Sequence, residues 1–368
     1  MITIPTNGVY HDLIAQSKNG SGKTGAFAIG TVLRIDQSVM KPQVLVLAHF
    51  RELSSQIADV YTRLCKHTNI VVTNFTADGR TEGVHVVVTT LGKLDNNLKK
   101  RGNSGKLDLS ALKCIVFDET DVFFGEERNL QQLKSMHAAY ISKLPNKPQH
   151  IFFSATYSED VKAQIGHFAQ LANQVCLKKE QLSLSHIKQF EYRCEQGKKP
   201  EFLKQVFNIC EMTQTVIFIN TKNYAERLQN MMRREGFKSR IIFGDMSPEE
   251  RDEMIEKFRQ GEISVIITTN LLARGIDVPE IQIVINFDVP TQKVGAQTVG
   301  DAENYLHRIG RTGRFGSKGI AISLYDRNED REYLQQILDH YNMSASMNKL
   351  EGPDQLRALL EEIRAETI

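Results

Sequence analysis

The chain has 368 residues, a length typical of two domains, with 41% hydrophobic and 24% charged residues. This composition excludes an intrinsically disordered chain, and the formal net charge of +2 neither requires nor excludes a nucleic-acid partner. No apolar run approaches the roughly 20 residues that span a bilayer and no signal peptide is present, so we expect a soluble intracellular protein without membrane insertion. The five cysteines show no C-x-x-C spacing, which argues against a disulfide framework or a zinc site.

The first half of the chain alternates strand patterns with helical segments. Its continuous apolar runs, a pattern typical of strands buried on both faces, lie at 12–15, 44–48, 85–88, 114–117 and 151–153. A helical segment runs from 51 to about 67. This alternation predicts βα units and a mainly parallel sheet. Ligands bind such sheets at the C-terminal ends of the strands, where the polar residues of this sequence gather.

The second half repeats this organisation after a polar stretch at 177–185. Strand patterns lie at 190–194, 216–219, 240–243, 265–267, 283–285 and 320–324, with helical segments such as 225–235 and 248–259 between them. We therefore expect an α/β protein with a first domain at 1–180, a linker at 181–187 and a second domain at 188–368. The second half has no G-K-T sequence, so we expect it to lack a nucleotide site of its own.

A phosphate-binding loop follows the first strand pattern. Gly20 and Gly22 allow the backbone to approach phosphate oxygens, and the next helix directs its free N–H groups and dipole to the same place. Lys23 is expected to reach the β- and γ-phosphates, and the Thr24 hydroxyl to hold Mg²⁺. Ser17 stands where G-x-x-x-x-G-K-T usually has its first glycine. The alternative interpretation is a surface turn that binds nothing.

Two further groups of charged residues suit phosphoryl transfer. Asp118 and Glu119 end a strand pattern, where one carboxylate can orient the water shell of Mg²⁺ and the other can polarise an attacking water. Arg311 and Arg314 are three residues apart and project to one side, and such an arginine is worth roughly 10³–10⁵ in rate. The alternatives are an acidic turn that caps a strand and a solvated basic run.

Weaker signals lie elsewhere along the chain. Asp277 could accept a hydrogen bond from a ribose hydroxyl, and Thr269 and the backbone of Gly275 could contact phosphates. Ser154 and Thr156 could cap the next helix and nothing more.

The motifs resemble, in order and over nearly the whole chain, those of the DEAD-box RNA helicases of superfamily 2. The similar segments are 15–24 (motif I), 51–53 (Ia), 90–93 (Ib), 118–121 (D-E-A-D), 154–156 (III), 216–221 (IV), 269–277 (V) and 307–314 (VI). The resemblance implies an α/β fold with two RecA-like domains, each a mainly parallel sheet with helices on both faces, joined by a short linker. It also implies ATP and Mg²⁺ as cofactors.

The resemblance implies these roles, residue by residue. The catalytic residues are Lys23, Asp118, Glu119, Arg311 and Arg314. The nucleotide is bound by Ser17, Lys18, Asn19, Gly20, Ser21, Gly22, Lys23, Thr24, Gly275 and Asp277. RNA is contacted by Arg51, Thr90, Gly92, Lys93, Thr221 and Thr269. Hydrolysis is coupled to RNA release by Ser154, Thr156, Asp121 and His307. Mg²⁺ is held, mostly through water, by Thr24 and Asp118. Backbone contacts of this kind predict sequence-tolerant, salt-sensitive RNA binding.

Within the family, the likeness is greatest to the mRNA-export helicase of the nuclear pore. It is carried by segments 14–17 and 187–190 and by a stretch at 290–305 that is longer than most relatives have before motif VI. This likeness implies a monomer in the cytoplasm and nucleus, at the cytoplasmic face of the nuclear pore. It also implies a nuclear-pore activator and inositol hexakisphosphate as partners. The translation-initiation helicase is the nearest alternative.

The sequence departs from the family pattern at several positions. Thr120 replaces the alanine of D-E-A-D, His49 and Phe50 stand where Pro-Thr or Pro-Ser is usual, Leu91 replaces a proline, and Phe243 stands where a histidine is usual. The adenine-reading Q motif, which lies upstream of the phosphate-binding loop in the family, is missing from the sequence. A non-hydrolysing RNA clamp and a DNA-directed helicase are therefore alternatives, although every charged catalytic position is intact.

Overall fold

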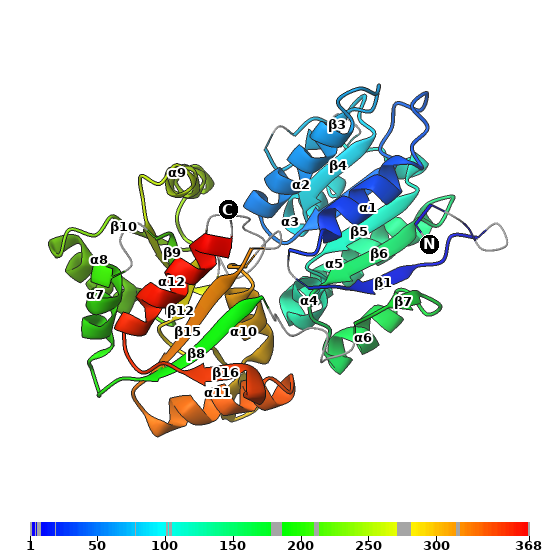
Figure 1. Cartoon of the computed structure of the whole chain (residues 1–368). Coiled ribbons are helices and arrows are strands. Elements are labelled where there is room, and N and C mark those ends of the chain that lie inside the picture. The colour runs from blue at the N-terminus through cyan, green and yellow to red at the C-terminus, as the bar shows by residue number, and fades with distance from the viewer. Residues whose placement is uncertain are drawn as a thin grey trace. The chain divides into compact units, whose positions relative to one another are not determined.

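The computed structural model describes residues 2, 3, 5, 9–18, 20–77, 79–100, 102, 105–177, 186–209, 213–270, 281–313 and 317–366. The chain divides into two compact units, Met1–Leu177 and Lys178–Ile368, and each unit is built on its own sheet (Figure 1). Most of the predicted linker lies outside the described residues, and Ile187 already begins a strand of the second unit.

The first unit contains a seven-stranded sheet in the order β3-β4-β2-β5-β6-β1-β7, with every neighbouring pair parallel. Its strands are β1 (Leu13–Gln16), β2 (Val44–Ala48), β3 (Val72–Asn74), β4 (Val86–Thr90), β5 (Cys114–Asp118), β6 (Gln149–Ser154) and β7 (Asn173–Val175). Its helices are α1 (Lys23–Val32), α2 (Arg51–Leu64), α3 (Leu91–Leu98), α4 (Thr120–Gly125), α5 (Glu127–Ala139) and α6 (Glu159–Gly166). Short 3-10 turns lie at Leu109–Ala111 and Ile141–Lys143.

Helices cover both faces of this sheet, which explains why β2 at its centre is apolar throughout. Val44 and Val46 of β2 belong to the cluster that also holds Phe27 of α1 and residues of α2. Leu45 and Leu47, the alternate residues of the same strand, belong to the opposite cluster with residues of α3, α5 and α6. Each buried side chain of this size stabilises the fold by about 1.5–3 kcal/mol, so a polar substitution at one of these β2 positions should destabilise the sheet.

The second unit contains another seven-stranded parallel sheet, in the order β10-β11-β9-β12-β15-β8-β16. Its strands are β8 (Ile187–Arg193), β9 (Thr215–Phe218), β10 (Ser239–Ile242), β11 (Val265–Thr268), β12 (Ile283–Asn286), β15 (Gly319–Tyr325) and β16 (Met347–Lys349). Its helices are α7 (Lys199–Ile209), α8 (Lys222–Arg234), α9 (Pro248–Arg259), α10 (Ala302–Ile309), α11 (Asn328–His340) and α12 (Asp354–Glu366), with a short 3-10 turn at Ser344–Ser346. The two sheets confirm the predicted fold class.

The structure adds elements that the sequence pattern did not predict. The edge strands β3, β7 and β16 have three residues each and no apolar alternation. An antiparallel hairpin, β13 (Thr291–Val294) and β14 (Gln297–Gly300), occupies most of the long stretch before motif VI. Gly295 turns the hairpin with a φ of 61°, and Gly300 approaches α11 so closely that a Cβ there would collide with the backbone carbonyl of Tyr333.

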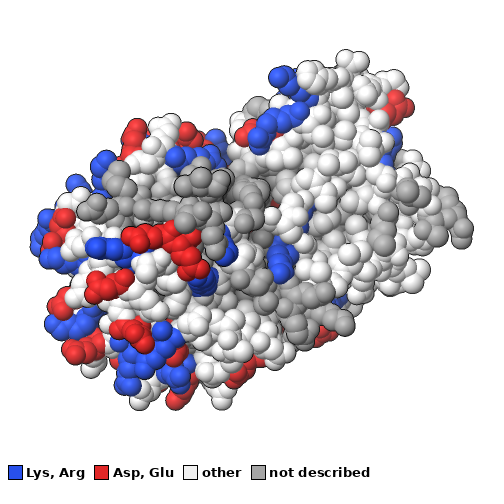
Figure 2. Space-filling view, in the orientation of Figure 1, with Lys and Arg blue, Asp and Glu red and all other residues white. Residues whose placement is uncertain are grey.

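Cys65, Cys114 and Cys194 are buried thiols and Cys176 is exposed, and these four are free. None of the helices in the described ranges is long and apolar enough to cross a membrane. Lys and Arg are interspersed with Asp and Glu over the visible face of the second unit, whereas the visible face of the first unit is mostly uncharged (Figure 2). Neither of these faces carries a large patch of positive or of negative charge.

Candidate nucleotide and RNA sites

The loop between β1 and α1 has the backbone geometry of a phosphate-binding loop. Gly20 and Gly22 have φ angles of 72° and 86°, which lie in the left-handed region where a Cβ is unfavourable. Lys23 is the first residue of α1, and its Nζ donates hydrogen bonds to the carbonyl oxygens of Ser17 and Lys18, both at 3.0 Å. The lysine ammonium is therefore held over the loop by the loop's own carbonyls.

The start of α1 is available to an anion. Gly22 is its N-cap residue and supplies no side-chain hydrogen bond, so the first N–H groups of the helix are not capped by a side chain. Thr24 lies half-buried in the first turn, and Ser21 is exposed with its hydroxyl beside that of Ser17. Asn19 lies outside the described residues. An uncapped helix N-terminus behind a glycine-bearing loop is a suitable phosphate site.

Asp118 and Glu119 form a buried carboxylate pair at the C-terminal end of β5. Their side chains are 4% and 5% exposed. Burial and the neighbouring Glu119 raise the pKa of Asp118 to about 7, while the positive charge of Lys23 and the hydrogen bond from the Glu119 N–H act in the opposite direction. The influence of Lys23 on Asp118 shows that the loop and the acidic pair lie at the same edge of the sheet.

Glu119 has a strained backbone and an unpaired carboxylate oxygen. Its φ of 56° and ψ of 54° are left-handed, a conformation that costs a residue with a Cβ about 1–3 kcal/mol. Its buried Oε2 makes no hydrogen bond within the described part of the chain. The Thr24 hydroxyl and the Asp118 carboxylate are hard oxygen ligands of the kind that Mg²⁺ prefers, so the residues present fit a magnesium ion.

Ser154, the last residue of β6, joins three segments at this edge. Its hydroxyl donates to Asp121 Oδ1 at 2.6 Å and accepts from the Thr156 N–H at 3.1 Å. Its carbonyl accepts from the Ser17 N–H at 3.2 Å. The D-E-T-D sequence, the segment after β6 and the phosphate-binding loop are therefore connected through one serine.

The unusual Thr120 is accommodated by hydrogen bonds. Its buried hydroxyl lies 3.1 Å from the carbonyl oxygen of Phe117 and 3.0 Å from that of Phe153, so it is bonded to the backbone of both β5 and β6. The Tyr157 hydroxyl also bonds to the Thr120 side chain and lies 3.5 Å from the carbonyl of Ala15. The hydroxyl that distinguishes this sequence from D-E-A-D is thus fully paired.

The residues of the first unit that are expected to contact RNA follow β2 and β4. These strands are paired, with Ala48 opposite Thr90. Arg51 begins α2 after β2, and Thr90 ends β4 as the N-cap residue of α3. Gly92 and Lys93 lie in the first turn of α3, where Lys93 is exposed. These four residues and the phosphate loop are all at or just after the C-terminal ends of parallel strands, so they lie at the same edge of the sheet.

The corresponding residues of the second unit follow the paired strands β9 and β11. Thr221 is the exposed N-cap residue of α8, and Thr269 follows β11 directly. Thr268 and Phe218 are opposite each other in the sheet. Sequence reasoning missed Asn220 and Asn270, which adjoin these threonines, and Arg308, whose buried guanidinium bonds to both asparagines. The signal available was that Arg308 stands inside motif VI.

Of the nucleotide-site residues predicted in the second unit, the structure describes some and not others. His307 lies on α10, and Arg311 follows that helix with its Nε donating to the His307 carbonyl at 3.1 Å. Gly275, Asp277 and Arg314 lie outside the described residues. Their roles therefore stay predictions.

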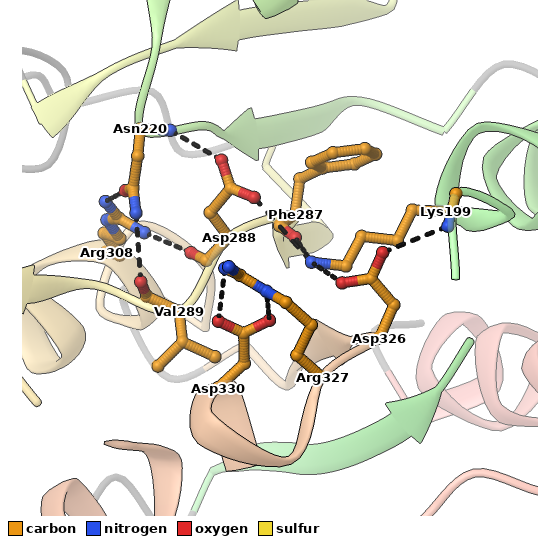
Figure 3. Close-up of polar contacts among 10 residues, drawn as sticks. Lys199, Asn220, Phe287, Asp288, Val289, Arg308, Asp326, Arg327 and Asp330 are labelled. Carbon is orange, nitrogen blue, oxygen red and sulfur yellow. Dashed lines mark hydrogen bonds and ion pairs between the residues drawn. The ribbon is translucent and has the colours of Figure 1, made fainter. Parts of the chain in front are cut away.

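The second unit also has a cavity of about 460 Å³ that no motif predicted. On its wall, Lys199 is buried and donates to the Phe287 carbonyl at 3.0 Å, with its Nζ 3.4 Å from Asp326 and 3.7 Å from Asp288 (Figure 3). Arg327 pairs with Asp330 at the rim. Lys199 is far in the sequence from both Asp288 and Asp326, which explains why no local pattern revealed this cluster.

Two protein families match the chain. The DEAD/DEAH box helicase family matches residues 2–164, and the family described as helicase conserved C-terminal domain matches residues 198–316. The first family therefore covers the phosphate loop and the acidic pair, and the second covers Thr221, Thr269 and Arg311.

Curated relatives and solved structures agree with this assignment. The chain is 36% identical over 331 residues to "ATP-dependent RNA helicase DBP5" of Mycosarcoma maydis, covering 89% of this chain and 70% of the relative. It is 36% identical over 344 residues to "ATP-dependent RNA helicase eIF4A" of Candida glabrata, covering 90% of this chain and 81% of the relative.

Two structures of Saccharomyces cerevisiae Dbp5 are similar to the chain, each at 30% identity. One is bound to RNA and ADP BeF3, with a TM-score of 0.87 and coverage of 97% of this chain and 90% of that chain. The other is a Dbp5 variant bound to a Gle1 variant and IP6, with a TM-score of 0.77 and coverage of 96% and 88%. With its phosphate loop, acidic strand end and two parallel sheets, the chain belongs to the DEAD-box family of ATP-dependent RNA helicases.

Proposed function

We propose that this helicase binds Mg-ATP at the C-terminal ends of β1 and β5 and couples hydrolysis to binding and local remodelling of RNA or RNA–protein complexes. One observation carries the proposal: Lys23 of the phosphate loop lies close enough to the buried Asp118 for its charge to oppose the rise that burial causes in the pKa of that carboxyl. A lysine on a phosphate loop beside two carboxylates provides both the charge that phosphates need and the acids that a metal and a water need.

The phosphate loop forms the first part of the proposed site. Lys23 offsets the charge of the β- and γ-phosphates, and the N–H groups at the start of α1 cradle them. Ser17, Lys18, Asn19, Gly20, Ser21 and Gly22 line the same loop. The positive φ angles of the two glycines support this role because they turn backbone N–H groups toward a common point.

The acidic pair forms the second part. Thr24 and Asp118 would hold Mg²⁺, mostly through water, and the ion would supply positive charge beside the transferred phosphoryl group. Glu119 accepts the proton of the attacking water, a role that suits its buried and unpaired Oε2. Ser154, which is hydrogen-bonded to Asp121 and to the Thr156 N–H, couples hydrolysis at this site to RNA release.

The second unit completes the proposed chemistry. Family resemblance supports Arg311 and Arg314 as the arginines that stabilise charge on the γ-phosphate, with Gly275 and Asp277 binding the nucleotide and His307 coupling its state to RNA. Arg51, Thr90, Gly92 and Lys93 of the first unit and Thr221 and Thr269 of the second bind the RNA backbone. Such contacts carry no base information, so binding is sequence-tolerant. We also propose a first domain at 1–180, a linker that begins at 181 and a second domain that begins at Ile187, one residue before the predicted start at 188, because β8 begins there.

The cellular role that we propose is mRNA export. The support is the likeness to Dbp5 structures bound to RNA and, in one case, to Gle1 and IP6. By this likeness the helicase acts as a monomer at the cytoplasmic face of the nuclear pore, with a Gle1-type activator and inositol hexakisphosphate as partners. The equally identical eIF4A relative makes translation initiation the second candidate.

Steady-state hydrolysis by the purified chain tests this function. We expect Mg-ATP turnover to be low alone, to rise at least tenfold with single-stranded RNA, and to be weaker with GTP. Glu119→Gln should retain ATP binding and lose turnover by roughly 10²–10⁴, the range for a general base. RNA binding without turnover in the wild-type chain would indicate a clamp, and wild-type turnover in Glu119→Gln would remove Glu119 from the mechanism.

A Gle1–IP6 titration then separates the two cellular roles. Stimulation of RNA-dependent hydrolysis by the Gle1–IP6 complex, and not by IP6 alone, is the expected result. No stimulation by the complex, with normal RNA-dependent turnover, would count against the export role and leave the helicase activity intact.

A further inference from the structure

Arg308 of α10 is a buried cation at the C-terminal edge of the second sheet. Its side chain is 0% exposed, and burial lowers the pKa of its guanidinium to about 10, so it remains charged at neutral pH. A charge in such a place persists only where its donors are paired. The groups that accept hydrogen bonds from Arg308 are therefore held in place around it.

The guanidinium binds two asparagines on two different strand ends. Nε and Nη2 donate to Asn270 Oδ1 at 3.0 and 2.6 Å, and Nη2 also donates to Asn220 Oδ1 at 3.1 Å. Nη1 donates to the Asp288 carbonyl at 2.8 Å (Figure 3). The cation also lies 5.2 Å from the ring centre of Phe218. One planar group thus joins the segments that follow β9, β11 and β12.

The backbone N–H of Asn220 and both polar atoms of its side chain are hydrogen-bonded. Its N–H donates to Asp288 Oδ2 at 2.8 Å, and its Nδ2 donates to the Val289 carbonyl at 3.2 Å (Figure 3). Lys199 approaches the other carboxylate oxygen of Asp288 at 3.7 Å. The asparagine therefore has one orientation, in which its side-chain oxygen faces Arg308.

The two asparagines are the chain neighbours of the two threonines that we assign to RNA. Asn220 precedes Thr221, and Asn270 follows Thr269. Both asparagines and Thr221 are exposed, while Arg308 is buried. The guanidinium therefore supports this surface from inside the unit and does not form part of it.

We propose that Arg308 is a positioning residue for RNA binding, which sets the separation of Thr221 and Thr269 by holding Asn220 and Asn270 with one guanidinium. The inference rests on the proposed RNA role of the threonines. A lysine cannot reproduce it, because an ammonium has no planar fork that spans two acceptors in fixed directions. The contact is made with side-chain amide oxygens, so a carboxylate at position 270 preserves it.

The test measures RNA affinity by fluorescence anisotropy and the RNA dependence of hydrolysis, with the full chain, Mg-ATP and a single-stranded RNA. Arg308→Lys should weaken RNA affinity about tenfold and raise the RNA concentration for half-maximal turnover equally, with maximal turnover within twofold of wild type. Asn270→Ala should show the same split, and Asn270→Asp should restore affinity to within twofold. ATP affinity without RNA should not change.

Controls separate this proposal from the function on which it rests. Arg327→Gln removes an exposed arginine of the same unit that pairs with Asp330, and RNA affinity should stay at the wild-type value. Thr221→Ala and Thr269→Ala should each weaken RNA binding. If they do and Arg308→Lys binds RNA normally, the positioning role is overturned while the RNA site stands.

Other outcomes are equally decisive. If neither threonine variant affects RNA affinity, the threonine assignment fails, and the positioning role fails with it. If Arg308→Lys does not fold, Asn270→Ala and Asn270→Asp decide. Equal loss of RNA affinity in both variants overturns the proposal, and a loss in Asn270→Ala alone supports it. A drop in maximal turnover without a change in RNA affinity also overturns it.

Discussion

The acidic pair at the end of β5 is destabilising as it stands, because two carboxylates are buried together. Burial and Glu119 raise the pKa of Asp118 to about 7, against 3.8 for an ordinary aspartate. A raised acid pKa means that the folded chain binds a proton that the unfolded chain has released. Between about pH 4 and pH 7 the stability of the first unit should therefore fall as pH rises.

Asp118→Asn tests this residue-scale argument. The variant cannot ionise at position 118, so without nucleotide or Mg²⁺ we expect it to unfold at a higher temperature than wild type at pH 8 and near the wild-type temperature at pH 5. Hydrolysis should be lost. Thermal unfolding at the two pH values is the measurement, and an equal difference at both would show that Asp118 is not the titrating group.

The hydroxyl pair of Thr120 and Tyr157 gives a second residue-scale prediction. Thr120→Ala leaves the buried Tyr157 hydroxyl with only the Ala15 carbonyl, at 3.5 Å, and should cost about 1–3 kcal/mol of unfolding free energy. Thr120→Ala with Tyr157→Phe removes both partners and should recover most of that loss. Denaturant unfolding of the two single variants and the double variant measures the coupling.

Additive effects in that cycle would show that the two hydroxyls act independently. A positive coupling would explain how a threonine is tolerated at the alanine position of D-E-A-D: the added hydroxyl has a partner on the segment after β6.

At the scale of elements, the β13–β14 hairpin is held against α11 by a glycine. A Cβ at Gly300 would meet the Tyr333 carbonyl, and the Gly300 N–H donates to Gln336 Oε1 at 2.9 Å. Gly300→Ala should therefore displace the hairpin and destabilise the second unit by about 1–3 kcal/mol. Urea unfolding measures this loss.

Gly295→Asn is the matched control in the same hairpin. Its position is left-handed with open space around it, and asparagine tolerates that conformation, so we expect a change within about 0.5 kcal/mol. A loss as large as that of Gly300→Ala would mean that the hairpin turn, and not its contact with α11, controls stability.

At the scale of the whole molecule, the RNA contacts that we propose for both units predict a strong dependence of RNA affinity on salt. The logarithm of affinity should fall linearly with the logarithm of salt concentration, with a slope of about −0.7 for each phosphate that a cation neutralises on a single strand. Lys93→Gln removes one exposed cation from α3 and should reduce the slope by about 0.7. Anisotropy titrations at several salt concentrations measure it.

Thr90→Ala is the uncharged comparison for that titration. It should weaken RNA binding and leave the salt slope unchanged, because a hydroxyl contact releases no counterion. An unchanged slope in Lys93→Gln would remove that lysine from the phosphate contacts.

The sequence by itself determined the two α/β units, the central strands and the chemistry at their ends. β2, β5, β11 and β12 are buried on both faces, so they are apolar up to their last residues and can be found without a structure. The residues directly after such strands lie at one edge of a parallel sheet, which is why the phosphate loop and Asp118 could be assigned to one site.

Only the tertiary structure decided the short edge elements and the contacts between distant residues. β3, β7 and β16 have three residues and neighbours on one side, so their burial leaves no alternation in the sequence. The predicted strand at 190–194 begins at Ile187 because that residue pairs with Gly319, which is far away in the chain. Arg308 meets Asn270 and Asn220 across 38 and 88 residues. Such contacts depend on packing in three dimensions, and no local pattern encodes them.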